Sequence, residues 1–492
     1  MIQKFLLSLL MVSNLACAVA PPTAAPTRPP SLIALQPCRF PNHKNELVCG
    51  KYVVYENRAS RAGRMIALNI VLVPAFASAP APDPVFFFAG GPGQGAARIA
   101  AAGEGSLMRE LRRERDLVFI DQRGTGGSHR LTCAATADPG SLQNNFGELF
   151  DLERIGACRR RLETDADLKL YTTAIAVDDV DEVRQALGYD KINLYGVSYG
   201  TLSALQYLRR YSGRVRSALL AGVATPAAKL PLQFAKGSQQ AMDRLLADCA
   251  ADESCHSAFP KLKDDFAALL AAFNAGPVRF ELTHRATKPA QAVTLSRGVY
   301  VERLRLLLYN HSSARLIPLV IHRAAQGDWL PFARVAMSTG LASAYSLTLG
   351  AYFSMTCSES VPFIADSEIR ETAATFMGEY RTRRHQLACA EWPRGEIPGD
   401  FFLPAKSDVP VLMLSGDLDP STPFEFGKAA ARHLPNSRQV LLRNTPHGYS
   451  SPCARSLAVD FIAKGTVQNL DTACAEQMRR PRFLTELPDR YQ

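Results

Sequence analysis

The amino-acid sequence predicts an α/β fold, in which a mostly parallel sheet carries helices on both faces and is interrupted by an inserted helical cap. Short, continuously apolar runs alternate with helical periodicity up to about residue 228, as in sheets whose strands are buried on both faces. Amphipathic helical segments then dominate up to about residue 404, after which the strand–helix alternation resumes. A length of 492 residues would allow two or three domains. The pattern favours instead one α/β domain that is split by a cap.

The strands of the sheet are expected where apolar runs end in glycine or in polar turn residues. They are residues 64–73, 85–88, 117–120, 192–195 and 218–220 before the helical block, and 409–414 and 439–442 after it. Apolar residues at helical spacing predict the helices, and strands are expected to be rare in the cap. The helices are residues 176–187, 202–211, 239–250, 262–273, 301–308, 369–380, 424–433 and 454–463.

The N-terminus has the parts of a secretory signal peptide over residues 1–18. Lys4 supplies a positive charge, an apolar stretch too short to span a bilayer follows, and small residues flank Cys17 as in a cleavage site. We expect cleavage after Ala18 and an exported protein, periplasmic or secreted. The alternative is a lipid anchor on Cys17, although Asn14 stands where such signals usually have leucine. The remaining chain divides into a Pro-rich spacer and N-terminal segment (19–48), the first part of the α/β core (49–228), the cap (229–404) and the C-terminal part of the core (405–492).

The cysteines indicate disulfides in an oxidising compartment. Of the 11 cysteines, ten remain when Cys17 leaves with the signal peptide or carries a lipid, and an even set in an exported protein is typical of disulfides. The sequence leaves their connectivity open, and we expect pairing between neighbours. A zinc site at Cys249, Cys255 and His256 is the alternative, but no C-x-x-C or H-E-x-x-H motif is present and no metal is expected. The neighbouring pairs are Cys38/Cys49, Cys133/Cys158, Cys249/Cys255, Cys357/Cys389 and Cys453/Cys474.

Composition excludes several classes of protein. Hydrophobic residues make up 47% and charged residues 21%, which excludes a disordered, collagenous or coiled-coil chain. The net charge of +10 is spread in small groups of arginines, so no nucleic-acid partner is expected. Beyond the N-terminus no apolar run reaches the ~18 residues of a membrane span. The oligomeric state is not defined by these features.

A nucleophile motif follows one of the predicted buried strands. Residues 196–200 read G-x-S-x-G, directly after the strand 192–195 and directly before a helix. This is the context of a nucleophile elbow, where a serine sits in a sharp, strained turn and glycines remove side chains that would clash. The sequence therefore predicts Ser198 as a nucleophile.

The base and the acid that activate such a serine should follow it in the order acid, then histidine. Asp419 lies in a proline-stiffened turn after the strand 409–414, and it is favoured over Asp417, which suits a turn or cap role. His447 lies in a loop after the last strand, whereas His433 ends a helix, where a cation suits the helix dipole. The predicted catalytic set is Ser198, Asp419 and His447.

Acyl transfer also needs donors for the developing oxyanion. The backbone N–H of Tyr199, the residue after the nucleophile, is one candidate, and Gly91 in the Gly-rich loop after residues 85–88 is the second. Residues 91–96 also fit a dinucleotide fingerprint, with Asp121 where a ribose-binding acid would stand. Against that alternative, Pro92 removes a donor from the loop, and the serine, aspartate and histidine would be left unexplained.

The motifs together resemble a known family. GGPGQGA (90–96), DQRGTGGS (121–128), YGVSYGT (195–201) and GDLDPSTP (416–423), with the His447 loop, are similar to the secreted tripeptidyl- and prolyl-aminopeptidase group of α/β-hydrolases over most of residues 50–465. The resemblance implies the same catalytic set, a helical cap and a C-terminal piece that completes the sheet. It also implies an acidic group for the free α-amine of the substrate, for which Glu359 is the candidate. Ala89 stands where prolyl-specific members usually have histidine, which argues against strict proline specificity.

The expected function is that of an exported serine peptidase. It would release amino acids or short peptides, including tripeptides, from free N-termini of peptide substrates through an acyl-enzyme, with no metal or organic cofactor. Asp121 and Arg123 are expected to brace the loops near the site. A carboxylesterase or lipase on the same fold is the nearest alternative, and an inactive binding module is another. The sequence leaves the number of released residues open.

Overall fold

The computed structural model describes residues 31–40, 47–101, 105–133, 140–284, 287–344 and 347–491. The predicted signal peptide, with Cys17, lies outside these described residues. In the described part of the chain, no helix is both long and apolar enough to cross a membrane.

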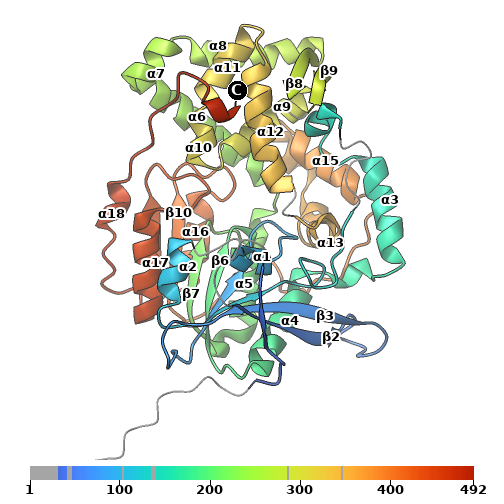
Figure 1. Ribbon diagram of the computed structural model, residues 1–492, viewed down its shortest axis with the longest axis vertical. Coiled ribbons are helices and arrows are strands. Elements are labelled where there is room, and N and C mark those ends of the chain that lie inside the picture. Colours follow the sequence, from blue (N-terminus) through green and yellow to red (C-terminus); the bar gives the residue numbers. More distant parts are fainter. Residues whose placement is uncertain are drawn as a thin grey trace, which may run out of the picture.

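A nine-stranded sheet forms the centre of the molecule, in the order β1-β2-β3-β5-β4-β6-β7-β10-β11 (Figure 1). The strands from β5 to β11 pair in parallel, and β1, β2 and β3 extend the sheet as antiparallel neighbours. The predicted strands are confirmed, and β1 and β2 add to them. The bounds are β1 Gln36–Cys38, β2 Leu47–Tyr55, β3 Met65–Val73, β4 Val85–Phe88, β5 Leu117–Ile120, β6 Ile192–Val197, β7 Val215–Ala221, β10 Val411–Gly416 and β11 Ser437–Leu442.

Helices cover both faces of the sheet, which explains why its inner strands are apolar throughout. Alternate residues of a strand point to opposite faces. In β6, Leu194 packs with the helices α4 (Thr173–Ala186) and α5 (Tyr199–Tyr211), whereas Tyr195 packs on the other face with α17 (Pro452–Lys464). Both faces are therefore buried, as expected for a parallel sheet. The shorter helices α1 (Ala97–Ala101), α2 (Ser106–Leu111), α16 (Phe424–Ala431) and α18 (Ala473–Glu476) complete the layers, whereas α3 (Leu152–Glu163) packs against helices inserted between β7 and β10.

Between β7 and β10 the chain builds the helical layer that lies over the sheet in Figure 1. As expected, helices dominate here and strands are rare, although the layer also contains an antiparallel pair, β8 (Val278–His284) and β9 (Thr287–Leu295). The apolar residues of the pair, such as Leu282 and Val293, are fully buried against the helices. The helices are α6 Gln233–Ala251, α7 Glu253–Ala258, α8 Leu262–Ala272, α9 Arg297–Leu307, α10 His311–Ala314, α11 Ile317–Ala325, α12 Leu330–Ala344, α13 Leu349–Glu359, α14 Asp366–Arg370 and α15 Tyr380–Cys389.

The helix predicted at residues 369–380 is wrong. Helix α14 ends at Arg370 and α15 begins at Tyr380, with turns between them. The hydroxyl of Thr372 donates to backbone carbonyls within this segment, and Gly378 adopts a φ of 57°. Such local side-chain bonds offer the backbone an alternative to the helix. The spacing of apolar residues alone does not predict these local hydrogen bonds.

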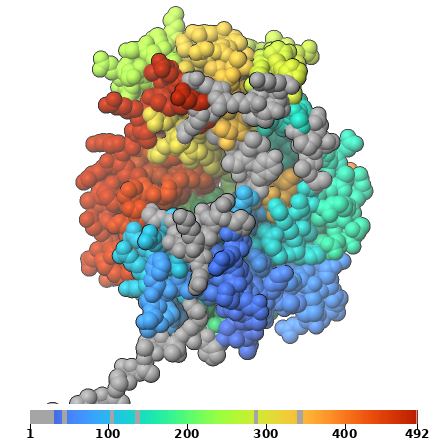
Figure 2. Space-filling view, viewed as in Figure 1, coloured from blue at the N-terminus to red at the C-terminus, as the bar shows by residue number. Residues whose placement is uncertain are grey.

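The C-terminal segment returns to the cap instead of ending on the sheet. Phe483 packs into the core of the helical layer, and the N–H of Leu484 donates to the carbonyl of Arg315 at 3.0 Å. Arg480 forms an ion pair with Asp248 of α6 at 2.7 Å. In Figures 1 and 2 this red segment runs along one side of the molecule toward the cap. It ties the last residues of the chain to the inserted helices.

All five predicted neighbouring cysteine pairs form disulfides. Each closes a local loop, and the sequence separations range from 6 to 32 residues. Loops of this size each restrict the unfolded chain and are worth about 2–4 kcal/mol in the entropic picture. The pair Cys357–Cys389 joins α13 to α15, two helices that border the site described next.

Candidate active site

Ser198 occupies a strained turn between β6 and α5. Its φ of 56° and ψ of −126° are rare for a residue with a side chain. Both motif glycines are required by close approach of other backbone. A Cβ on Gly196 would lie 2.7 Å from the carbonyl oxygen of Gly200, and a Cβ on Gly200 would lie 2.0 Å from that of Phe88. The G-x-S-x-G pattern is thus explained by space as well as by the turn.

The structure pairs His447 with Asp419. His447 Nδ1 lies 2.7 Å from Asp419 Oδ2. Asp417 does not contact the imidazole in this way, and its Oδ1 instead accepts the backbone N–H of Thr445, which holds the histidine loop. His433 follows α16 and lines a separate cavity of about 190 Å³. The structure thus brings Asp419 and His447 together, and their roles as acid and base remain predictions.

The carboxylate of Asp419 is buried and fully supplied with donors. It accepts the backbone N–H groups of Ser421 and Thr422 at 2.8 and 2.9 Å, the Thr422 hydroxyl at 2.7 Å and the Tyr449 hydroxyl at 2.6 Å. Burial alone would raise the pKa of Asp419, but the His447 imidazole and these hydrogen bonds outweigh it and hold the pKa below its usual range. The group therefore stays ionised beside the histidine.

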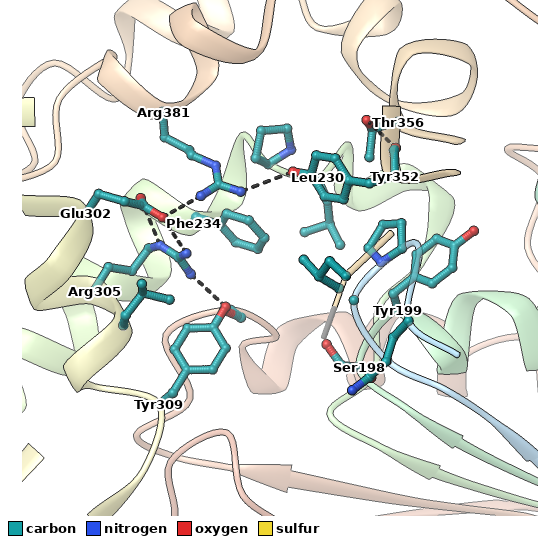
Figure 3. A pocket seen from close by; sticks show the side chains of 18 of the residues that line it. Ser198, Tyr199, Leu230, Phe234, Glu302, Arg305, Tyr309, Tyr352, Thr356 and Arg381 are labelled. Carbon is teal, nitrogen blue, oxygen red and sulfur yellow. Dashed lines mark hydrogen bonds and ion pairs between the residues drawn. The ribbon is translucent and has the colours of Figure 1, made fainter. Parts of the chain in front are cut away.

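Ser198 and His447 line one cavity of about 610 Å³. Residues of the sheet edge form one wall, and residues of α6, α9, α13 and α15 form the other. Figure 3 shows Ser198 and Tyr199 on one side of the space, with the Tyr199 hydroxyl directed away from it, and Phe234 on the other side. Most of the lining is apolar, as in pockets that bind organic ligands.

The two proposed oxyanion donors lie at this cavity as well. Gly91 and Tyr199 both line it. The Gly-rich loop passes close to Ser198, because a Cβ on Gly90 would lie 3.3 Å from the Cβ of that serine. Gly91 itself has a φ of 47°. Their role as donors remains a prediction.

Asp121 and Arg123 brace the loops, as expected from the sequence. Asp121 accepts the backbone N–H groups of Ala97 and Gly127, each at 2.8 Å. Arg123 is fully buried and forms an ion pair with Asp179 at 2.6 Å. Because the carboxylate of Asp121 is engaged by backbone donors, it is not available for a ribose hydroxyl. The geometry thus argues against the dinucleotide alternative.

Glu359 lies behind the cavity wall and not in it. Its carboxylate accepts the hydroxyl of Thr173 at 2.6 Å and also the Thr173 backbone N–H. The same hydroxyl contacts that of Tyr199, whose residue lines the cavity. Burial raises the pKa of Glu359 to about 7, although the bonds from Thr173 oppose the rise. Its predicted contact with a substrate amine remains a prediction.

Sequence reasoning missed a charged cluster on the opposite side of the cavity. Glu302 and Arg305 of α9 and Arg381 of α15 line the space and bond to one another (Figure 3). The available signal was a Glu and an Arg three residues apart on the buried face of a helix. Among the described residues, no group of three or more His, Cys, Asp or Glu side chains is arranged to hold a metal ion.

Comparison with known proteins defines the family. A family model described as alpha/beta hydrolase fold matches residues 83–449, so the chain belongs to the alpha/beta hydrolase fold family. Serine protease Hip1 of Mycobacterium tuberculosis is 26% identical over 434 residues, 82% of each chain. Tripeptidyl aminopeptidase of Streptomyces lividans is 24% identical over 433 residues, 78% of this chain and 75% of that protein. The solved proline iminopeptidase of Mycobacterium smegmatis has a TM-score of 0.41 at 16% identity, covering 84% of this chain and 98% of its own.

Proposed function

We propose that the protein is an exported serine peptidase that releases amino acids or short peptides, such as tripeptides, from the free N-termini of peptides. The observation that carries the proposal is the hydrogen bond between His447 and the buried Asp419, at the cavity that the strained Ser198 lines. Relatives named as a serine protease and a tripeptidyl aminopeptidase support peptide substrates. Five disulfides support an oxidising compartment outside the cytosol.

In the proposed reaction, Ser198 Oγ attacks the scissile carbonyl while His447 Nε2 takes its proton. The bond to Asp419 keeps the proton on Nδ1, so Nε2 is free to accept. The backbone N–H groups of Gly91 and Tyr199 donate to the oxyanion. The histidine then protonates the leaving amine, the C–N bond breaks, and an acyl-enzyme remains. Water repeats the sequence and releases the acyl fragment.

The cap is the proposed reason for acting on chain ends. Residues 229–404 supply α6, α9, α13 and α15, which line the cavity above the nucleophile, and a covered space favours a chain terminus over an internal segment. Glu359 is the proposed acidic group toward the substrate ammonium. It would act from behind Tyr199 and Thr173.

Hydrolysis of matched anilides tests the proposal. Peptide anilides with a free N-terminus should be cleaved at least about tenfold faster than their N-acetylated counterparts, because acetylation removes the ammonium charge that the Glu359 carboxylate is proposed to attract from behind the cavity wall. The variant Ser198→Ala, prepared in parallel, should cleave neither. Faster hydrolysis of the acetylated anilide or of a simple ester would favour the carboxylesterase or lipase alternative.

A further inference from the structure

The proposed mechanism leaves unused the charged cluster of Glu302, Arg305 and Arg381. Arg305 donates from Nε and from a terminal nitrogen to the two carboxylate oxygens of Glu302, at 3.1 and 2.6 Å. Arg381 donates to one of the same oxygens from a different helix. All three side chains are largely buried, with exposed fractions of 4% for Arg305, 8% for Glu302 and 11% for Arg381. In Figure 3 they lie together across the cavity from Ser198.

The cluster gives the cavity an excess of positive charge. Among the described lining residues Glu302 is the single carboxylate, whereas Arg303, Arg305 and Arg381 all line the space. Burial would raise the pKa of Glu302, but the guanidinium groups hold it below its usual range. Glu302 is therefore ionised, and its single negative charge is smaller than the positive charge of the three arginines. His385 adds no charge, because burial and Arg381 lower its pKa well below the usual value. In a partly buried space such an excess is weakly screened.

The two guanidinium groups are held in place and keep unused donors. The ring of Phe234 lies 4.8 Å from the guanidinium carbon of Arg305 and 5.5 Å from that of Arg381. Arg305 also donates to the hydroxyl of Tyr309 at 2.6 Å, and Arg381 to that of Tyr352 at 3.1 Å. Each guanidinium has five N–H donors. Within the described part of the chain, the buried Nε of Arg381 has no hydrogen-bond partner.

We propose that Arg305 and Arg381 bind a carboxylate of the substrate peptide. Planar guanidinium groups match a carboxylate through paired, charge-assisted hydrogen bonds. A substrate ammonium, by contrast, would be repelled at this wall. The inference rests on the proposed peptidase function and narrows its substrates to peptides that carry a negative charge.

The position of the cluster indicates how far along the substrate this carboxylate lies from the scissile bond. The hydroxyl of Tyr309 accepts from Arg305, and the ring of Tyr309 lies 5.0 Å from the His447 imidazole between centroids. One tyrosine side chain therefore bridges the two, a length of about two extended residues at ~3.4 Å each. The carboxylate is either the C-terminal group of a short peptide or a Glu or Asp side chain within about two residues of the cleaved bond.

Two pairs of short peptides test the proposal and distinguish these sources. One pair differs only in a C-terminal carboxylate or carboxamide, and the other only in Glu or Gln next to the cleaved bond. In at least one pair the anionic member should have a kcat/KM at least about tenfold higher, and the ratio should fall with added salt. The variants Arg305→Gln and Arg381→Gln should bring the ratio close to one. Arg370→Gln, at an exposed ion pair of the cap, should leave it unchanged.

Binding to Ser198→Ala, measured by calorimetry with the same peptides, gives a readout that does not require turnover. Tighter binding of the anionic member supports the inference even if no peptide is cleaved. The absence of cleavage would contradict only the proposed peptidase function. Equal kcat/KM and equal affinity within both pairs overturn the inference, as does a preference that persists in both arginine variants. Should the glutamine variants fail to fold, Arg305→Lys and Arg381→Lys keep the charge but lose the paired geometry. With these the ratio should fall without vanishing, and an unchanged ratio contradicts the paired contact.

Discussion

At the scale of single residues, the central distinction is between two aspartates in one turn. Asp417 and Asp419 both follow β10, and the sequence distinguishes them only by distance from the strand and by neighbouring prolines. In the structure, Asp419 forms hydrogen bonds with His447 and Tyr449, whereas Asp417 accepts a hydrogen bond from the backbone of Thr445. The difference follows from where the turn directs each side chain, which spacing predicts weakly.

Substitution of each aspartate tests this distinction. Asp419→Asn should lower kcat by about 10⁴-fold, because an amide no longer holds the proton on His447 Nδ1. Asp417→Asn, the matched control, keeps an acceptor for the Thr445 N–H and should lower kcat less than about tenfold. Steady-state kinetics on a peptide anilide measure both. Equal losses in the two variants would contradict the assignment of the acid.

The raised pKa of Glu359 should make the free energy of unfolding depend on pH. Its pKa rises to about 7 from 4.5, so the folded protein keeps a proton that the unfolded chain has already lost. Stability should therefore fall as the pH rises from about 4.5 toward 7. The shift corresponds to roughly 3 kcal/mol at most.

Glu359→Gln removes this titration while retaining one acceptor for Thr173. The free energy of unfolding of the variant, relative to that of the wild type, should increase by roughly 2–3 kcal/mol between pH 5 and pH 8. Urea unfolding at both pH values measures it. A difference that does not change with pH would show that Glu359 is ionised throughout.

At the scale of elements, the sharp turn at Ser198 was predictable and the turns of the cap were not. Two glycines around a serine, after an apolar run, leave few local structures, and the contacts of Gly196 and Gly200 explain why. The segment between α14 and α15 has helical spacing, yet the Thr372 hydroxyl and the left-handed Gly378 form turns. The spacing of apolar residues predicts which side chains are buried, but it does not predict these local hydrogen bonds.

Gly200→Ala tests the packing of the elbow. The added Cβ would meet the Phe88 carbonyl, which is backbone and has little freedom to move. We expect the free energy of unfolding to fall by more than about 3 kcal/mol. Gly213→Ala is a suitable control further along the same connection, since nothing lies within 4 Å of its Cβ. Thermal unfolding of both variants checks this, and a Gly200→Ala protein as stable as the control would argue against the close approach.

At the scale of the whole molecule, the α/β sheet with an insertion was predictable, whereas the contacts between distant segments were not. Arg381 reaches Glu302 across 79 positions of sequence, and Leu484 bonds to Arg315 in the cap. No local pattern encodes such pairs, because they depend on how the helices pack. The charged cluster and the return of the C-terminus therefore became visible only in three dimensions.

Tyr309 links the cap to His447, and we propose that it acts as a positioning residue for this histidine. Its ring packs on His447, and its hydroxyl contacts Arg305 and Ser421. Tyr309→Phe keeps the ring and should lower kcat by about fivefold, the value of one hydrogen bond. Tyr309→Ala should lower it further and change the pH profile of kcat, which a merely structural loss would not do. Unchanged pH profiles of kcat in both variants would show that Tyr309 does not position His447.

The most direct test of the central claim is the intact mass of the protein during turnover of a peptide anilide. After rapid acid quenching, we expect an added mass equal to the acyl fragment, located by digestion on the peptide that contains Ser198. The adduct should be absent from Ser198→Ala. Turnover of the anilide by wild-type protein without any adduct, together with activity in Ser198→Ala, would contradict the claim that Ser198 forms an acyl-enzyme.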